Sequence, residues 1–166
     1  MNEKVLRTLE YNKILSKLSE FAGSAPGKRM CDKLRPSTNK EWIENAQLET
    51  ESALNRLMKN DRISFGANED IRGIIKTIQK GHSATSGELL LIARILTETT
   101  ALEKYGQKEH EDDPDDALTP LFESLYPLPL LEKEITRCII SEDEIADDAS
   151  SELSSIRKKY SIIDGR

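Results

Sequence analysis

The segment from Ser86 to about Tyr105 most constrains the fold of this chain. Apolar residues occupy nearly every face of a helix drawn through it; they are Leu89, Leu90, Leu91, Ile92, Ala93, Ile95 and Leu96. A helix that is apolar nearly all round has to be covered by other elements. The sequence therefore predicts a domain packed around this central helix.

The other long segments also repeat their apolar residues with the period of a helix, and none alternates as a half-buried strand does. The expected helices are 8–22, a short helix between Ser24 and Pro36, 39–59, a short helix between Asn68 and Gly81, 86–105, 118–125, one marked by Leu131 to Ile139, and one from Ser150. The predicted fold class is all-α, an irregular bundle of about eight helices. We expect one domain over residues 1–166.

Several helix starts carry capping signals. Thr38 with Glu41, and Thr85 with Glu88, have the spacing of a capping box. Ser24 and Ser150 are placed as N-caps. In the first helix the residues expected to face the core are Tyr11, Ile14, Leu15, Leu18 and Phe21.

The segment from Glu109 to Asp116 holds six carboxylates in eight residues, and one proline. Its like charges predict a mobile, solvated loop at 109–116. Carboxylates are also ligands for divalent cations, and His110 lies among them. The segment lacks the D-x-[DN]-x-[DN]-G spacing of a calcium loop. A solvated linker is therefore the preferred interpretation over a metal site.

The final stretch, 150–166, opens a helix whose apolar residues lie on one narrow stripe. Leu153, Ile156, Tyr160 and Ile163 recur at intervals of three, four and three, as in a coiled-coil seam. We interpret this stretch as the start of a longer helix. Tyr160 and Ile163 are expected to be exposed.

Residues with chemical potential occur singly or in pairs. They are Cys31, Cys138 and His82, and the pairs Asp147 with Asp148, Lys28 with Arg29, and Lys158 with Lys159. Both cysteines fall on apolar sides of predicted helices and are interpreted as core residues rather than nucleophiles. The two aspartates are interpreted as charges that are favoured near a helix N-terminus. The two basic pairs are interpreted as parts of solvated helix faces.

No known chemical motif is present. The sequence contains no G-x-x-x-x-G-K-[ST], no G-x-G-x-x-G and no H-E-x-x-H. It therefore assigns no catalytic, cofactor-binding or metal-ligating residue, and it leaves any nucleic-acid-binding residues unassigned.

Composition narrows the functional class. The chain has 166 residues and a formal net charge of −6, which opposes a surface devoted to polyanions. Its two cysteines lie far apart, which favours a reducing compartment over a disulfide scaffold. No signal peptide opens the chain, and no apolar run of membrane-spanning length occurs. We expect a cytoplasmic protein with no membrane partner.

Three stretches, in order and in register, are similar to the N-terminus of the MutS2 family, the bacterial MutS paralogues that carry a C-terminal Smr nuclease domain. The stretches are LRTLEYNKILSKLSEFAGSAPGKRMCDKLRPST at Leu6–Thr38, ISFGANEDIRGII at Ile63–Ile75 and EITRCIISEDEIADDASSELSSIRKK at Glu134–Lys159. The chain departs from the family pattern at Ser151, where a proline is frequent, and in the acidic insert at 109–116.

The resemblance implies that this chain is the first part of the helical core, or lever, domain. It implies an ATPase that uses ATP and Mg, and a nuclease domain, both outside these residues. It also implies a homodimer that acts on DNA, in suppression of recombination, or on collided ribosomes. The fragment alone is expected to be a monomer, or a weak dimer through the helix at 150–166.

Three other interpretations remain open from the residues alone. A stand-alone helical adaptor would bind a partner helix in a groove. A helix-turn-helix DNA binder would need a basic recognition helix, and no predicted segment is strongly basic. A metal-dependent enzyme would use the acidic segment.

Overall fold

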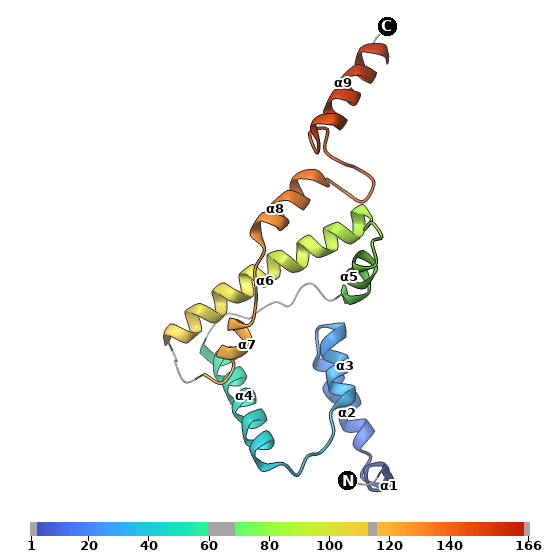
Figure 1. The fold of residues 1–166 in the computed structure, drawn as a ribbon. Coiled ribbons are helices and arrows are strands. Elements are labelled where there is room, and N and C mark those ends of the chain that lie inside the picture. Colours follow the sequence, from blue (N-terminus) through green and yellow to red (C-terminus); the bar gives the residue numbers. More distant parts are fainter. Residues whose placement is uncertain (1–2, 60–68, 113–115, 165–166) are drawn as a thin grey trace. The chain divides into compact units, whose positions relative to one another are not determined.

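The computed structural model describes residues 3–59, 69–112 and 116–164 (Figure 1). The described residues form nine helices and no strand, which confirms the all-α class. The helices are α1 (Glu3–Thr8), α2 (Tyr11–Phe21), α3 (Ala25–Lys33), α4 (Lys40–Lys59), α5 (Arg72–Gln79), α6 (Ser86–Asp112), α7 (Thr119–Glu123), α8 (Pro129–Cys138) and α9 (Ser151–Asp164).

The contacts divide the chain into two compact units. The first unit comprises Met1–Asp70 and Ala101–Tyr126, and the second comprises Ile71–Thr100 and Pro127–Arg166. Helix α6 supplies residues to both units. At about 1.5 Å per residue, its 27 residues are roughly 40 Å long.

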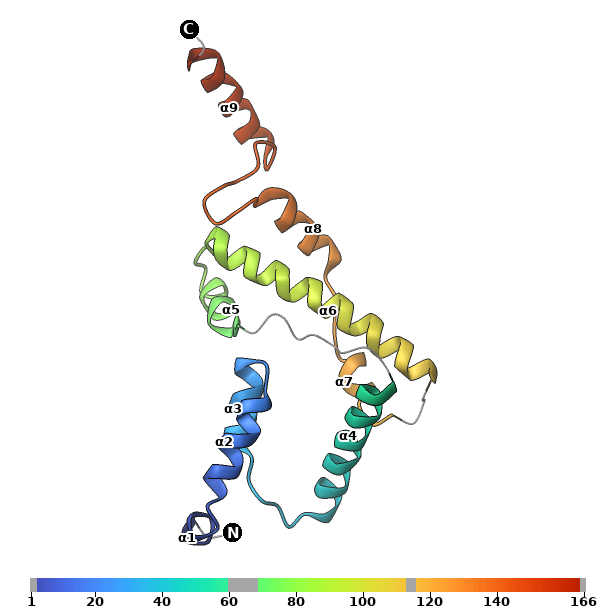
Figure 2. The same cartoon turned by 180° about the vertical axis from the view of Figure 1, so that it is seen from behind.

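The core of the second unit lies where α5 and α8 cover the first half of α6 (Figures 1 and 2). Ile92 and Ala93 of α6 are buried against Ile135 of α8 and Ile139, which follows that helix. The partly buried residues around them are Ile71, Ile74, Leu89, Leu90, Leu96 and Cys138. The apolar run of the sequence is thus covered as predicted in this part of α6.

A polar contact adds to this packing. The Thr97 hydroxyl of α6 donates a hydrogen bond to a carboxylate oxygen of Glu132 in α8, over 2.7 Å. Thr99 and Thr100 instead donate to the carbonyls of Ile95 and Leu96, one turn earlier in α6. Bonds of this kind satisfy a hydroxyl within a helix without a partner from another element.

Residues 3–21 form two helices, where the sequence predicted one from about Thr8 to Ala22. Glu10 separates α1 from α2, because its φ of 52° lies in the left-handed region and interrupts the helix. In α2 only Leu15 is buried, whereas Ile14 is 58% and Phe21 87% exposed. The predicted buried stripe is therefore wrong at most of its positions, because no described element covers that face.

Three predicted caps are confirmed. Thr85 and Glu88 form the capping box of α6: the Thr85 N–H donates to the Glu88 carboxylate over 2.8 Å, and the Glu88 N–H donates to the Thr85 hydroxyl over 3.3 Å. The hydroxyls of Ser24 and Ser150 each accept from the N–H three residues later, over 3.1 Å. These bonds begin α3 and α9.

The capping box predicted for Thr38 and Glu41 is wrong. Asn39 caps α4 instead, since its side-chain oxygen accepts from the Trp42 N–H over 3.1 Å. The Ser37 hydroxyl accepts from the Asn39 N–H, also over 3.1 Å, and so holds the residue before the helix. The short amide of Asn39 provides the same acceptor one position later.

The acidic segment differs from the predicted loop at both ends. Helix α6 continues to Asp112, well past Tyr105, so residues 109–112 are helical. Asp116 is buried in an ion pair. Residues 113–115 of the predicted loop lie outside the described residues, as does Asn68, the predicted cap of α5.

Gly106 of α6 provides a test of the packing between α6 and α7. A Cβ atom at this position would lie 2.3 Å from the Cβ of Phe122, which is closer than two non-bonded carbon atoms approach each other. We expect Gly106→Ala to lower the free energy of unfolding by about 1–3 kcal/mol, because α7 must shift to admit the methyl group.

The matched control is Gly73→Ala, in helix α5, where a new Cβ would meet nothing within 4 Å. Alanine has a higher helix propensity than glycine, and Gly73 lies in the first turn of α5, so this variant should not lose stability. Urea denaturation followed by circular dichroism measures both changes. Equal effects of the two substitutions would contradict the close contact with Phe122.

Candidate functional site

A buried ion pair joins the end of α4 to the segment before α7. The Arg56 Nε donates to Oδ2 of Asp116 over 2.5 Å, and the two side chains are only 4% and 5% exposed. The other Asp116 oxygen accepts from the Leu118 N–H over 2.7 Å. The Ser52 hydroxyl of α4 accepts from the Ala117 N–H over 3.1 Å. These polar contacts thus hold the start of α7 against α4.

Two aromatic rings enclose the Arg56 guanidinium. Its central carbon lies 4.5 Å from the Phe122 ring centroid and 5.4 Å from that of Tyr105. The two rings are themselves 5.7 Å apart and tilted by 53°. A cation over an aromatic face is attracted by the ring electrons. The Nη1 and Nη2 atoms have no hydrogen-bond partner among the described residues, so this contact and Asp116 hold the cation.

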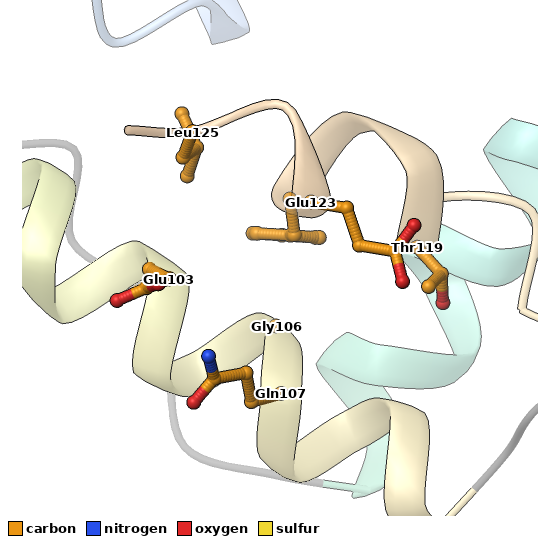
Figure 3. Close-up of a pocket in the computed structure, with 7 residues that line it drawn as sticks. Glu103, Gly106, Gln107, Thr119, Glu123 and Leu125 are labelled. Carbon is orange, nitrogen blue, oxygen red and sulfur yellow. The ribbon is translucent and has the colours of Figure 1, made fainter. Parts of the chain in front are cut away.

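A small pocket of about 210 Å³ lies beside this cluster, between α6 and α7 (Figure 3). Figure 3 shows Glu103 and Gln107 on α6, facing Glu123 and Leu125 from α7 and the residues after it. The pocket is smaller than the roughly 300–1,000 Å³ of usual ligand sites. Its lining includes two carboxylates and no cation, which does not suit the phosphates of a nucleotide.

Cys138, at the end of α8, lies in a second polar cluster. Arg137 pairs with Glu134 over 2.6 Å and donates to the Asp148 carbonyl over 2.9 Å. Burial raises the pKa of the Cys138 thiol, and the neighbouring Arg137 cation opposes only part of this shift. The hydrogen bond and charge of Arg137 lower the pKa of Glu134. Cys138 is therefore a protonated thiol at neutral pH, which makes it a poor nucleophile.

The remaining candidates stand apart from one another. His82 is exposed, and Cys31 is half-buried. The His110 side chain lies outside the described residues. Lys28 is exposed, while its neighbour Arg29 pairs with Asp70 over 2.6 Å.

Of the candidate residues near α9, Asp147 forms an ion pair with Arg157. Arg157 donates to the Asp147 carboxylate and, over 3.0 Å, to the Ile145 carbonyl. Lys158 and Lys159 are exposed. Within residues 3–59, 69–112 and 116–164, no three His, Cys, Asp or Glu side chains gather as metal ligands would. None of the helices in these ranges has the length and apolar character to cross a membrane.

Arg56 and Asp116 were not identified from the sequence. Asp116 is the last charge of the acidic segment 109–116, and Arg56 lies among other charged residues of α4. The available signal was that Asp116 directly precedes the apolar residues Ala117 and Leu118, which lead into α7. A partner 60 residues away is not encoded in local spacing.

Removal of one partner tests the buried ion pair. Asp116→Asn should lower the free energy of unfolding by about 3–5 kcal/mol, because it leaves the Arg56 charge buried without compensation. Arg56→Met added to this variant should recover part of the loss, since an apolar side chain suits the two rings. Denaturant titration measures both.

The control for this experiment is Glu44→Gln. Lys40 and Glu44 are 3.5 Å apart, and their side chains are 87% and 58% exposed. Exposed pairs contribute little to stability, so the unfolding midpoint should hardly change. A similar loss in Asp116→Asn and Glu44→Gln would show that the burial of the Arg56 pair has no energetic effect.

The raised pKa of Cys138 can be measured in a Cys31→Ser variant, in which Cys138 is the single thiol. Alkylation by iodoacetamide requires the thiolate, so a higher pKa leaves less reactive thiol at each pH. We expect the rate to rise with pH through an inflection above about 8.5, the ordinary cysteine value. In denaturant the inflection should return to that value. An inflection below it in the folded chain would mean an activated cysteine.

Comparison with known proteins gives consistent matches, although no family model matches the chain. The chain is 46% identical to the endonuclease MutS2 of Lachnoclostridium phytofermentans, over 98% of its own length and 21% of the relative's. The corresponding protein of Agathobacter rectalis is 40% identical, over 95% of this chain and 20% of the relative. That of Halothermothrix orenii is 34% identical, over the whole chain and 22% of the relative.

The chain therefore spans about one fifth of the length of the curated relatives that it matches. These matches agree with the resemblance of the three stretches. Over nearly its whole length, this chain matches a fragment of MutS2-family proteins.

Proposed function

We propose that this chain is a non-catalytic helical core segment of a MutS2-type endonuclease. The observation that carries the proposal is the match of nearly the whole chain to about a fifth of proteins named endonuclease MutS2. The longer protein would act on nucleic acid in the cytoplasm, as a homodimer on DNA or on ribosomes. Its ATP, Mg and nuclease sites would belong to other segments.

The geometry of the reactive residues supports a non-catalytic role. Hydrolysis needs a nucleophile or a metal-activated water, placed beside groups that stabilise the developing charge. Cys138 is held protonated, and the carboxylates of Asp116 and Asp147 are occupied by arginines. The pocket beside α7 carries carboxylates where a nucleotide would require cations.

The exposed apolar residues support a role as a packed segment of a larger assembly. Tyr160, Ile162 and Ile163 of α9 are 69%, 68% and 71% exposed, as predicted for Tyr160 and Ile163. Each such side chain gains about 1.5–3 kcal/mol when it is fully buried. We propose that the rest of the polypeptide covers them. A rigid packed segment can then transmit movement from an ATPase to a distant nucleic-acid clamp.

The proposal predicts that the isolated chain neither binds ATP nor cuts nucleic acid. It should hold duplex DNA, single-stranded DNA and a ribosomal RNA fragment only at about 10⁻⁴ M or weaker at physiological salt, because its net charge of −6 opposes the approach of a polyanion. Fluorescence anisotropy at about 150 mM salt measures this binding. Nucleotide binding and cleavage are assayed beside a full-length MutS2 as positive control. Sub-micromolar affinity or cleavage by the isolated chain would refute a purely structural role.

The stand-alone adaptor remains the second candidate, and the exposed stripe of α9 is the observation that favours it. An adaptor would recognise a separate helix in trans. Expression of the gene in its natural context distinguishes the two hypotheses: a polypeptide about five times this length would support the segment. A natural product of 166 residues would support the adaptor.

A further inference from the structure

An open groove of about 650 Å³ lies in the first unit, where α3 ends and α4 begins. We call it the Trp42 groove; its lining residues are Met30, Lys33, Leu34, Arg35, Pro36, Ser37, Asn39 and Trp42. Met30 is 74% exposed, Trp42 48% and Leu34 40%. A large apolar surface is therefore presented to solvent in one concave place, although it belongs to a highly charged chain.

The walls of this groove are held by local hydrogen bonds. Arg35 donates to the carbonyls of Asp32 and Leu34 over 3.1 and 2.8 Å, which satisfies the end of α3. Ser37 and Asn39 accept from backbone N–H groups at the start of α4. These polar groups are thus committed to the chain itself. The apolar surface and the Lys33 ammonium remain available to a ligand.

The charge of the groove is opposite to that of the whole chain. Its lining holds Lys33 and Arg35 and no carboxylate, whereas the chain has a net charge of −6. The lining therefore attracts a negative ligand locally, although the chain as a whole is negatively charged. The apolar residues of the groove require that the ligand also carries a bulky apolar group, because only such a group removes Met30 and Trp42 from water.

We propose that the Trp42 groove binds an acidic peptide segment of another protein through a leucine-like side chain. The side chain would lie against Trp42 and Met30, and a flanking carboxylate would face Lys33. Sites for single-stranded nucleic acid combine several stacking aromatics with cations that follow the backbone. The groove has one aromatic residue, and its other apolar residues are aliphatic or proline.

Trp42 is the single tryptophan of the chain, so its fluorescence reports on this groove alone. The probe is a short tryptophan-free peptide of alternating glutamate and leucine, added to the 166-residue chain. We expect a saturable shift of the emission to shorter wavelengths as leucine covers the indole. Peptides with glutamine in place of glutamate, or alanine in place of leucine, should bind more weakly.

Lys33→Glu should weaken binding about fivefold or more, because attraction becomes repulsion at an exposed site. Lys133→Glu, on α8 of the second unit, makes the same charge change outside the groove and should have no effect. Circular dichroism verifies that both variants are folded.

Four results would overturn the proposal. They are the absence of a saturable shift, equal binding of the glutamine peptide, tighter binding of single-stranded DNA or RNA at the same salt, and unchanged affinity in Lys33→Glu. A shift that depends on protein concentration without peptide would assign the groove to a second copy of the chain, and would equally reject an acidic partner.

Discussion

The apolar surface of α6 is the constraint on which the arrangement of the described helices depends. A helix that is apolar on nearly every face cannot remain in water, so several elements have to cover it. In the second unit α5 and α8 do so, with Ile92 and Ala93 at the centre. In the first unit Gly106 of the same helix lets Phe122 of α7 approach closely. Helix α6 thus contributes packing residues to each unit.

The first unit depends on a polar contact, whereas the second unit depends on the packing of aliphatic side chains. Among its described residues the buried side chains include Arg56, Asp116 and Thr119, with Leu15 as the buried hydrophobic residue. Burial of two charges costs much of what their attraction returns, so such a pair adds little net stability. However, each buried charge requires the other as its specific partner. The pair therefore selects how α4 and α7 meet, while the apolar faces of α2 and α4 remain available for further packing.

Helix type and helix ends were predictable from the sequence because their causes are local. Thr85, Ser24 and Ser150 cap the residues that directly follow them, and these caps are found as expected. Burial was less predictable, because it depends on what lies opposite in space. Phe21 has the period of a core residue and is nevertheless exposed. Asp116 has the neighbours of a solvated loop and is nevertheless buried, because Arg56 is 60 residues away in sequence. The Trp42 groove was missed for the same reason.

The contact between Gly106 and Phe122 also has a consequence for the divergence of this chain. The phenyl group occupies the space in which any larger residue at 106 would place its Cβ. The two positions therefore do not drift independently. A lineage that acquires a side chain at 106 must first, or at the same time, lose bulk at 122. Among homologues this pair should be inherited as a single trait, although sixteen residues separate its members.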